Sequence, residues 1–338
     1  MSEAGAPEKP RTVLAMSAGT LADLFTPALS ARLSAVAQVE TELASGDLRL
    51  YARSLRDAEV LLTGWGAPRI GAAELDLMPR LRAIVHAGGT IKTFLDPSVL
   101  ARGIAVSSAA EANAIPVAEF TLAAIIFAAK RVTRTAHRYR VTGSMRDLDE
   151  LPPIGANGIV VGVVGASRVG RRVLELLRVL DVSVLLTDPY LDAAAAADLG
   201  AELTGLDDLM RRADIVTLHA PAGPATDGMI SRSLLARMRD GAVVINTARG
   251  SLVDTGALTA ELASGRLDAI LDVTDPEPLP DGSPLFGLPN VLLTPHIAGA
   301  LGNEIHRLGE VAVAEIERLA AGLPLVHPVR FEDLERIA

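Results

Sequence analysis

The chain has 338 residues, enough for about two domains of roughly 150 residues each. Hydrophobic residues make up 49% of it and charged residues 22%, which predicts a packed globular protein, and the net charge of −9 argues against nucleic acid or an anionic membrane as partner. Cysteine is absent, which excludes disulfides, thiolate zinc sites, iron–sulfur clusters and cysteine nucleophiles and is compatible with a reducing cytoplasm.

The first hundred or so residues favour a small α/β domain. The opening residues, MSEAGAPEKP, are polar and lack the apolar core of a secretory signal, so we expect a flexible tail and a cytoplasmic protein. Short apolar runs separated by helical segments then predict strands. These runs are TVLAMS (12–17), EVLLTG (59–64), LRAIVHAG (81–88) and IAVSS (104–108).

A long helical stretch follows, from about Pro116 to Tyr139. Its apolar part, FTLAAIIFAA (120–129), lies between Glu119 and Lys130 and is too short to span a bilayer. We therefore predict a buried helix and no membrane partner.

The middle of the chain alternates apolar runs with segments of helical periodicity. The runs contain almost no polar alternation, which is typical of parallel strands covered on both faces. Strand–helix alternation over this length predicts a doubly wound parallel sheet of the Rossmann type. The predicted strands are 159–165, 182–188, 214–220, 242–248, 268–273 and 290–296.

These elements predict two domains. The Rossmann-type domain is expected at residues 113–298. The smaller, flavodoxin-like α/β domain is expected at residues 1–112, completed by a C-terminal helical segment at 299–338 that returns to it.

The sequence GASRVG, at 165–170, follows the first of the central strands and opens a helix. A dinucleotide-binding loop has the pattern G-x-G-x-x-G, in which the glycines permit a tight turn, close approach of the pyrophosphate and helix–strand packing. Serine replaces the middle glycine here, which leaves the tightness of binding open. We assign the cofactor loop to Gly165, Ser167, Arg168, Val169 and Gly170; the alternative is a glycine turn without a ligand.

Asp188 ends the next strand, 23 residues after Gly165. An acid about 20 residues after the first glycine binds the ribose hydroxyls of the adenosine half, and it repels the 2′-phosphate of NADP. The loop and Asp188 together predict NAD as the cofactor.

Three later segments carry chemistry at the carboxyl ends of strands, where an open α/β sheet binds ligands. They are NTARG with Arg249, LDVTDPEP with Glu277, and LTPHIAG with His296. Histidine suits proton transfer in both directions because its ordinary pKa is about 6.5. A carboxylate against the imidazole would fix its tautomer, and a guanidinium can clamp a substrate carboxylate and polarise its carbonyl. We therefore predict that Arg249, Glu277 and His296 together catalyse the reduction of a 2-oxo acid.

With these motifs in this order and spacing, the chain resembles the D-isomer-specific 2-hydroxyacid dehydrogenase family, which includes D-lactate, hydroxypyruvate and phosphoglycerate dehydrogenases. The resemblance is clearest from about Ala83 to Gly299. It implies the same roles for Arg249, Glu277 and His296, and an active site in the cleft between two domains. It also implies a homodimer, with helix 117–130 in the interface. Further contacts that it implies are the backbone of Gly88 and Gly89 on the substrate carboxylate, Asp272 on the nicotinamide amide, and Asn113, His219, Pro221, Thr247 and Ala248 along the cofactor.

The chain departs from the family pattern where the substrate side chain is read. Thr90 and Lys92 follow the glycine turn where many relatives have Asp and other polar residues. Trp65 stands where relatives often have a polar loop, and it forms either a wall of the substrate pocket or a partly buried loop aromatic. His86 either touches substrate or is structural. The sequence therefore leaves the substrate open.

The candidate residues also have plainer interpretations. His296 alone would be a hydrogen-bonded core histidine, and Asp275 competes with Glu277 for the role of its partner. The other histidines (137, 306 and 327) are expected to be structural. We find no H-E-x-x-H spacing and predict no metal, and the absence of G-x-S-x-G disfavours a serine hydrolase.

We therefore predict an NAD-dependent oxidoreductase that interconverts a small D-2-hydroxy acid and a 2-oxo acid. Phosphoglycerate as substrate is disfavoured because no regulatory domain follows residue 338, and formate because that branch has Gln in place of the Glu. The alternatives left open are an enzyme that oxidises phosphite and a non-catalytic protein that senses NAD(H).

Overall fold

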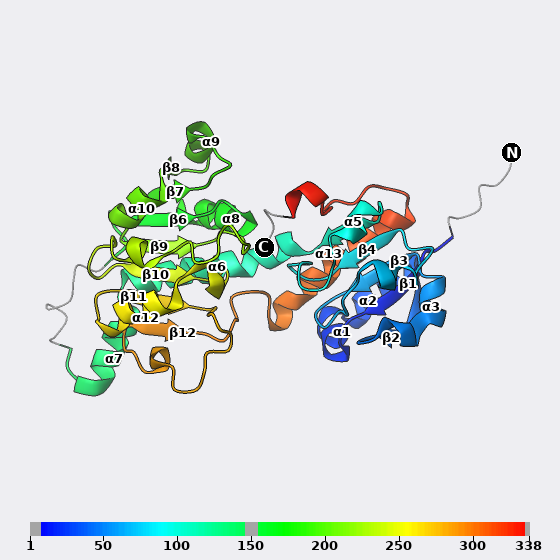
Figure 1. The fold of residues 1–338 in the computed structure, drawn as a ribbon, viewed down its shortest axis with the longest axis horizontal. Helices are drawn as coiled ribbons and strands as arrows, with labels where there is room; N and C mark the ends of the chain where they lie inside the picture. The colour runs from blue at the N-terminus through cyan, green and yellow to red at the C-terminus, as the bar shows by residue number, and fades with distance from the viewer. Residues whose placement is uncertain (1–7, 146–154, 335–338) are drawn as a thin grey trace. The chain divides into compact units, whose positions relative to one another are not determined.

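The computed structural model describes residues 8–145 and 155–334. They divide into two compact units, which Figure 1 shows as two ribbons of mixed helices and strands. Unit 1 contains the residues up to Asn113 and those from Ala300 onward, and unit 2 runs from Ala114 to Gly299.

Unit 1 is a parallel sheet of five strands in the order β2-β1-β3-β4-β5. Its strands are β1 (Arg11–Ala15), β2 (Gln38–Ala44), β3 (Val60–Thr63), β4 (Ala83–His86) and β5 (Ala105–Ser108). Its helices are α1 (Ala18–Leu24), α2 (Pro27–Val36), α3 (Ala52–Arg56), α4 (Ala72–Leu75), α5 (Ser98–Ala101) and α13 (Ile305–Ala320), with short 3-10 turns η1 (Leu48–Tyr51), η5 (Gly302–Glu304) and η6 (Phe331–Asp333).

Strand β2 was not predicted from the sequence. The segment QVETELA forms the edge of the sheet, and its polar residues Gln38, Glu40 and Glu42 occupy alternate positions, so no continuous apolar run marks it. Its partner β1 reads RTVLA and is buried on both faces from Thr12 onward.

Helix α13 packs into the core of unit 1, although it lies near the end of the chain. Its buried residues recur at helical spacing, at Ile305, Leu308, Ala312 and Ile316. They belong to the same apolar cluster as residues of α1, α2, β3 and β4. Burial of this face therefore ties the last part of the chain to the first sheet.

Unit 2 is a parallel sheet of seven strands in the order β12-β11-β10-β9-β6-β7-β8. The strands are β6 (Val160–Val164), β7 (Ser183–Thr187), β8 (Glu202–Leu203), β9 (Ile215–Leu218), β10 (Val243–Asn246), β11 (Asp268–Leu271) and β12 (Val291–Leu293). Strand order reverses at β6, between β7 on one side and β9 on the other, and ligands of doubly wound sheets bind at such a switch point.

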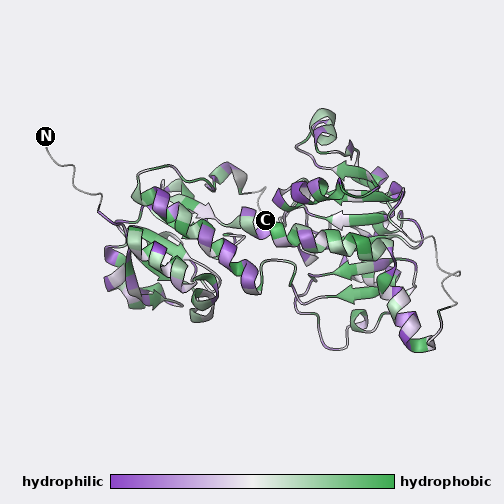
Figure 2. Ribbon diagram, turned by 180° about the vertical axis from the view of Figure 1, so that it is seen from behind, coloured by the Kyte–Doolittle hydropathy of each residue, from purple (hydrophilic) through white to green (hydrophobic). Residues whose placement is uncertain are grey.

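Helices cover both faces of this sheet, which explains the continuous apolar strands. One apolar cluster joins the strands to α10, α11 and α12, and the other joins them to α6 and α8. Figure 2 shows the strands mostly in the colours of apolar residues. The helices are α6 (Ala110–Ala129), α7 (Val132–Thr142), α8 (Arg168–Leu177), α9 (Ala193–Asp198), α10 (Leu206–Arg212), α11 (Arg232–Leu235) and α12 (Thr255–Ala263), with turns η3 (Gly250–Leu252) and η4 (Pro284–Phe286). The predicted Rossmann-type architecture is confirmed.

The helical stretch predicted from 116 to 139 is two helices, α6 and α7, separated by Arg131. This residue has a φ of 53°, in the left-handed region, so the α-helix cannot continue through it. Its guanidinium donates to the carbonyl of Gly241 and contacts the buried carboxylate of Asp268, which also accepts from Arg134 at 2.6 Å. These contacts link the start of α7 to Asp268 and to the loop at Gly241.

Helix α6 is longer than the apolar stretch predicted from sequence. At 20 residues it is long and apolar enough to cross a membrane by length and composition, but 56% of its apolar window is buried inside the structure. A core helix passes the same test, so this is weak evidence for a membrane.

Candidate active site

The glycine loop joins β6 to α8, and protein packing explains both of its outer glycines. Gly165 has a φ of 94°, and a Cβ there would lie 2.7 Å from the backbone nitrogen of Ala220. A Cβ on Gly170 would lie 2.0 Å from the carbonyl oxygen of Gly165. Ser167, at the middle position, is the N-cap of α8, and its hydroxyl accepts from the N–H of Gly170 at 3.3 Å. The serine is therefore a helix cap within an intact loop.

Asp188 lies beside this loop at the end of β7. One carboxylate oxygen accepts from the N–H of Ala166 at 2.7 Å, and the other accepts from the N–H of Tyr190 at 2.9 Å. A carboxylate oxygen can accept more than one hydrogen bond, so ribose hydroxyls can still donate to it.

The donor set here fits a dinucleotide. The first turn of α8 contains no acidic residue and begins with Arg168, so this helix N-terminus presents positive potential to a pyrophosphate. The role of Asp188 as acceptor for the ribose hydroxyls stays a prediction.

His219 and Pro221 follow β9, the strand beside the glycine loop. The N–H of His219 donates to the carbonyl of Val164 at 2.8 Å, and its imidazole Nε2 lies 2.9 Å from the Thr217 hydroxyl. Burial lowers the pKa of His219 to about 3, so the ring is neutral. His219 is therefore a buried, uncharged side chain packed beside the glycine loop.

Asn246 shapes the loop that carries Arg249, and the sequence analysis did not single it out. Its amide nitrogen donates to the carbonyl of Arg249 at 2.8 Å, and its amide oxygen accepts from the N–H of Ala248 at 3.0 Å. The neighbouring Thr247 hydroxyl lies 2.9 Å from that of Thr121 on α6. Asn246 was within the motif NTARG, but an asparagine there gives no sign that it folds back on its own loop.

Arg249 extends from this loop and is partly buried. Burial lowers the pKa of its guanidinium, and the negative charge of Glu277 acts in the opposite direction. One guanidinium nitrogen donates to the carbonyl of Ala248 at 2.6 Å. The remaining N–H groups leave a planar fork for a carboxylate or carbonyl.

His296 and Glu277 form a close pair in unit 2. Imidazole Nδ1 lies 2.6 Å from a carboxylate oxygen of Glu277, and both side chains remain nearly half exposed. Glu277, and not its competitor Asp275, therefore contacts the histidine. The pair leaves Nε2 as the nitrogen that can exchange a proton with a substrate.

Asp272 holds the segment that carries His296. Its carboxylate is buried and accepts from the Thr294 hydroxyl at 2.6 Å and from the N–H groups of Ile297 and Ala298 at 2.8 and 2.9 Å. Its carbonyl accepts from the N–H of His296, whose φ is 56°. The contact with a nicotinamide amide that the resemblance implies stays a prediction.

In unit 1, the predicted substrate residues lie at the carboxyl ends of β3 and β4. Thr63 pairs with His86 in the register of these strands, so Trp65 and Gly88 both follow at the same edge. Trp65 is 41% exposed, and its carbonyl accepts from the N–H of Ser17 and the hydroxyl of Thr20, both at 3.0 Å. Its role in substrate binding stays a prediction.

The turn at Gly88 and Gly89 in unit 1 packs closely against the side chains of His86 and Asn113. A Cβ on Gly88 would lie 2.4 Å from His86 Nε2, and one on Gly89 would lie 3.1 Å from the amide nitrogen of Asn113. Asn113 also accepts from the N–H of Ala300 at 3.1 Å. Its described contacts thus lie in unit 1, and its predicted contact with the cofactor is untested.

The burial of His86 predicts that the free energy of unfolding depends on pH. Burial lowers its pKa to about 4, and Nδ1 lies 2.9 Å from the Thr63 hydroxyl. Because the pKa in the unfolded chain is about 6.5, the unfolded state binds more protons between these values, and the free energy of unfolding should fall by up to about 3 kcal/mol as pH drops from about 6.5 to about 4.

The check is chemical denaturation of the wild type and His86→Asn across that pH range. The variant should lose less stability on acidification. His219 contributes with the same sign in both proteins and cancels in the comparison. Equal slopes for the two proteins would contradict the assignment to His86.

Within residues 8–145 and 155–334, no group of three or more His, Asp or Glu side chains is arranged to hold a metal ion. The candidate site of unit 2 therefore consists of the glycine loop, Asp188 and the side chains of Arg249, Glu277 and His296.

Comparison with known proteins identifies the family of the chain. Residues 122–298 match the family model described as D-isomer specific 2-hydroxyacid dehydrogenase, NAD binding domain. The chain therefore belongs to the D-isomer specific 2-hydroxyacid dehydrogenase family, and unit 2 contains its NAD-binding domain. The predicted family and the predicted NAD cofactor are confirmed.

Three relatives illustrate the range of the family. The chain is 34% identical over 302 residues to D-3-phosphoglycerate dehydrogenase of Mycobacterium bovis, which covers 89% of this chain and 56% of that protein. It is 32% identical to glyoxylate reductase of Aeropyrum pernix, covering 79% of this chain and 81% of the relative. The crystal structure of D-lactate dehydrogenase from Aquifex aeolicus, complexed with NAD and lactic acid, matches with a TM-score of 0.71 and 25% identity over 92% of this chain and 95% of that one. The chain spans about half the length of the phosphoglycerate dehydrogenases that it matches.

Proposed function

We propose that this protein is an NAD-dependent dehydrogenase that interconverts a small D-2-hydroxy acid and the corresponding 2-oxo acid. The observation that carries the proposal is the 2.6 Å contact between His296 and Glu277 in the NAD-binding unit. Family membership supports the reaction class, and the partly buried Arg249 supports an anionic substrate.

His296 acts as the acid–base group in this proposal. Bound cofactor would supply the hydride to the carbonyl carbon as NADH and would accept it in the reverse direction as NAD⁺. During reduction, protonated His296 gives its Nε2 proton to the substrate carbonyl oxygen; during oxidation, neutral His296 takes the hydroxyl proton. Glu277 holds Nδ1, which fixes the orientation of the ring.

Arg249 binds the substrate carboxylate and polarises its carbonyl through the planar fork of its guanidinium. In unit 1, the turn at Gly88 and Gly89 is proposed to present backbone N–H groups to a carboxylate, and Trp65 to face the substrate side chain. The close packing of the turn on His86 and Asn113 supports a fixed backbone there.

A homodimer is also part of the proposal. Helix α7 has no buried residue, and its Tyr139 and Val141 are exposed. Phe127 in α6 and Met145 after α7 are exposed as well, and the four side chains are 48 to 74% exposed. A second copy of the chain would cover them. A cytoplasmic location stays a prediction.

The test is a panel of 2-oxo acids: glyoxylate, hydroxypyruvate, pyruvate, 2-oxobutyrate and phenylpyruvate. We expect loss of NADH absorbance with at least one of them, and much slower loss with NADPH because Asp188 repels the 2′-phosphate. NADH binding without turnover of any acid would contradict the proposal and favour a phosphite-oxidising enzyme or a sensor of NAD(H).

A further inference from the structure

The position of Glu277 depends on contacts that fix the loop in which it lies. Residues 274–278 follow β11 without forming a helix or strand, and four of the five are exposed. Exposed loops sample many conformations, whereas a displacement of about 1 Å in a catalytic group can cost about a hundredfold in rate. The contacts of residues 274–276 should therefore matter for the placement of Glu277.

Two threonines hold the backbone just before Glu277. The hydroxyl of Thr255, the first residue of α12, donates to the carbonyl of Asp275 at 2.8 Å. The hydroxyl of Thr274 donates to the carbonyl of Pro276 at 2.9 Å, within the loop itself. Thr255 thus tethers the loop to a neighbouring helix.

Gly250 forms a second contact with this loop. A Cβ on Gly250 would lie 2.0 Å from the carbonyl carbon of Thr274 and 2.5 Å from the nitrogen of Asp275, so the two backbones touch. Gly250 directly follows Arg249 in the chain. The contact therefore joins the segment of Arg249 to the segment of Glu277.

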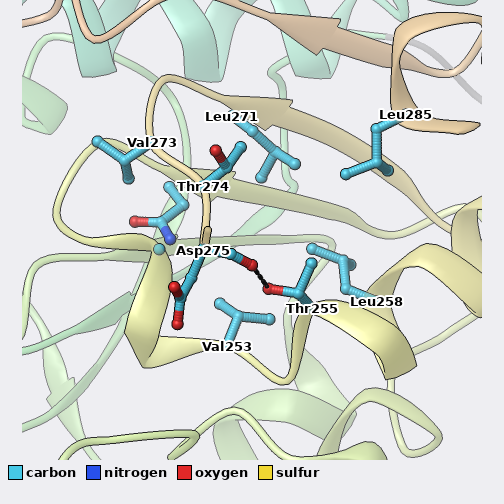
Figure 3. Close-up of a pocket in the computed structure, with 10 residues that line it drawn as sticks. Val253, Thr255, Leu258, Leu271, Val273, Thr274, Asp275 and Leu285 are labelled. Atoms are coloured by element: carbon cyan, nitrogen blue, oxygen red, sulfur yellow. Dashed lines mark hydrogen bonds between the residues drawn. The ribbon is translucent and has the colours of Figure 1, made fainter. Parts of the chain in front are cut away.

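Beneath the tether lies a small pocket with mainly apolar walls. Figure 3 shows the Thr255 hydroxyl and the Asp275 carbonyl joined at its rim. The side chains of Val253, Leu258, Leu271 and Leu285 line the pocket around them. This hydrogen bond is exposed to solvent, so without the Thr255 hydroxyl the Asp275 carbonyl would bond to water instead, and the loop would lose its link to α12.

We propose that Thr255 is a positioning residue that holds Glu277 against His296 through the carbonyl of Asp275. This inference rests on the proposed acid–base role of His296. Thr255 itself touches neither substrate nor cofactor in this mechanism.

The experiment compares Thr255→Val, which keeps the shape and removes the hydroxyl, with Thr255→Ser, which keeps the hydroxyl. Thr259→Val, one turn further along α12 and outside the pocket, is the matched control. For Thr255→Val we expect kcat to fall about 10-fold or more, with the Kd of NADH unchanged within about twofold. Thr255→Ser should restore most of kcat, and Thr259→Val should resemble the wild type.

A double-mutant cycle separates positioning from a general loss of structure. If Thr255 acts through Glu277, Thr255→Val should lower kcat no further when Glu277 is already alanine. An equal loss in both backgrounds, or failure of Thr255→Ser to restore kcat, would overturn the proposal.

Hydrogen exchange gives a readout that does not depend on activity. Amide exchange in the peptide covering residues 272–280 should be faster in Thr255→Val than in Thr259→Val, while the strands of unit 2 stay unchanged. Unchanged exchange in that peptide would overturn the tether. The activity panel alone decides the proposed function, so the two can fail separately.

Discussion

Replacing His296 with asparagine should lower kcat for 2-oxo acid reduction by about a thousandfold and leave the Kd of NADH within about twofold. General acid catalysis by a side chain contributes about 10²- to 10⁴-fold, and Glu277 cannot replace it because the carboxylate is an acceptor when ionised. Asparagine suits the position because His296 has a φ of 56°, and asparagine adopts left-handed backbone more readily than alanine.

The measurements are steady-state kinetics with the best acid of the panel and NADH binding followed by fluorescence. His137→Asn, at an exposed position on α7, is the matched control and should keep full activity. Asparagine at 296 with kcat within about tenfold of the wild type would show that another group transfers the proton. Loss of NADH binding would show that the substitution disturbs the fold of unit 2.

The fold of unit 2 was predictable because its strands are continuous apolar runs, and the positions of Arg249, Glu277 and His296 at strand ends follow from those runs. The choice between Asp275 and Glu277 depended on a loop conformation that no periodicity specifies. The structure resolves it because the carboxylate of Glu277 meets Nδ1 of His296.

Three other features could not be read from the sequence for related reasons. The roles of Asn246 and Thr255 are hydrogen bonds from side chains to loop carbonyls, and such bonds leave no pattern of spacing. The break at Arg131 lies at a left-handed residue whose side chain contacts Asp268, 137 residues away in the chain, and local periodicity does not show such a contact. Edge strand β2 lacked the double-sided burial that revealed the other strands.

Replacing Arg249 with lysine should lower kcat/KM for 2-oxo acids by about a hundredfold, mainly through a higher KM. Lysine keeps a positive charge but lacks the planar fork that binds a carboxylate through two parallel hydrogen bonds. A hydrogen bond to a charged group contributes about 1.5 to 3 kcal/mol, which corresponds to roughly 10- to 150-fold in affinity.

Burial makes the lysine variant sensitive to pH as well. The burial that lowers the pKa of Arg249 leaves a guanidinium charged at neutral pH, but the same burial lowers a lysine from a starting value of only about 10.4. A lysine at 249 should therefore lose its proton as pH rises, and its deficit relative to the wild type should widen between about pH 7 and pH 9. Arg172→Lys, in an exposed ion pair with Glu175, is the control and should show neither effect. A lysine variant with wild-type kcat/KM at both pH values would show that Arg249 does not bind the substrate carboxylate.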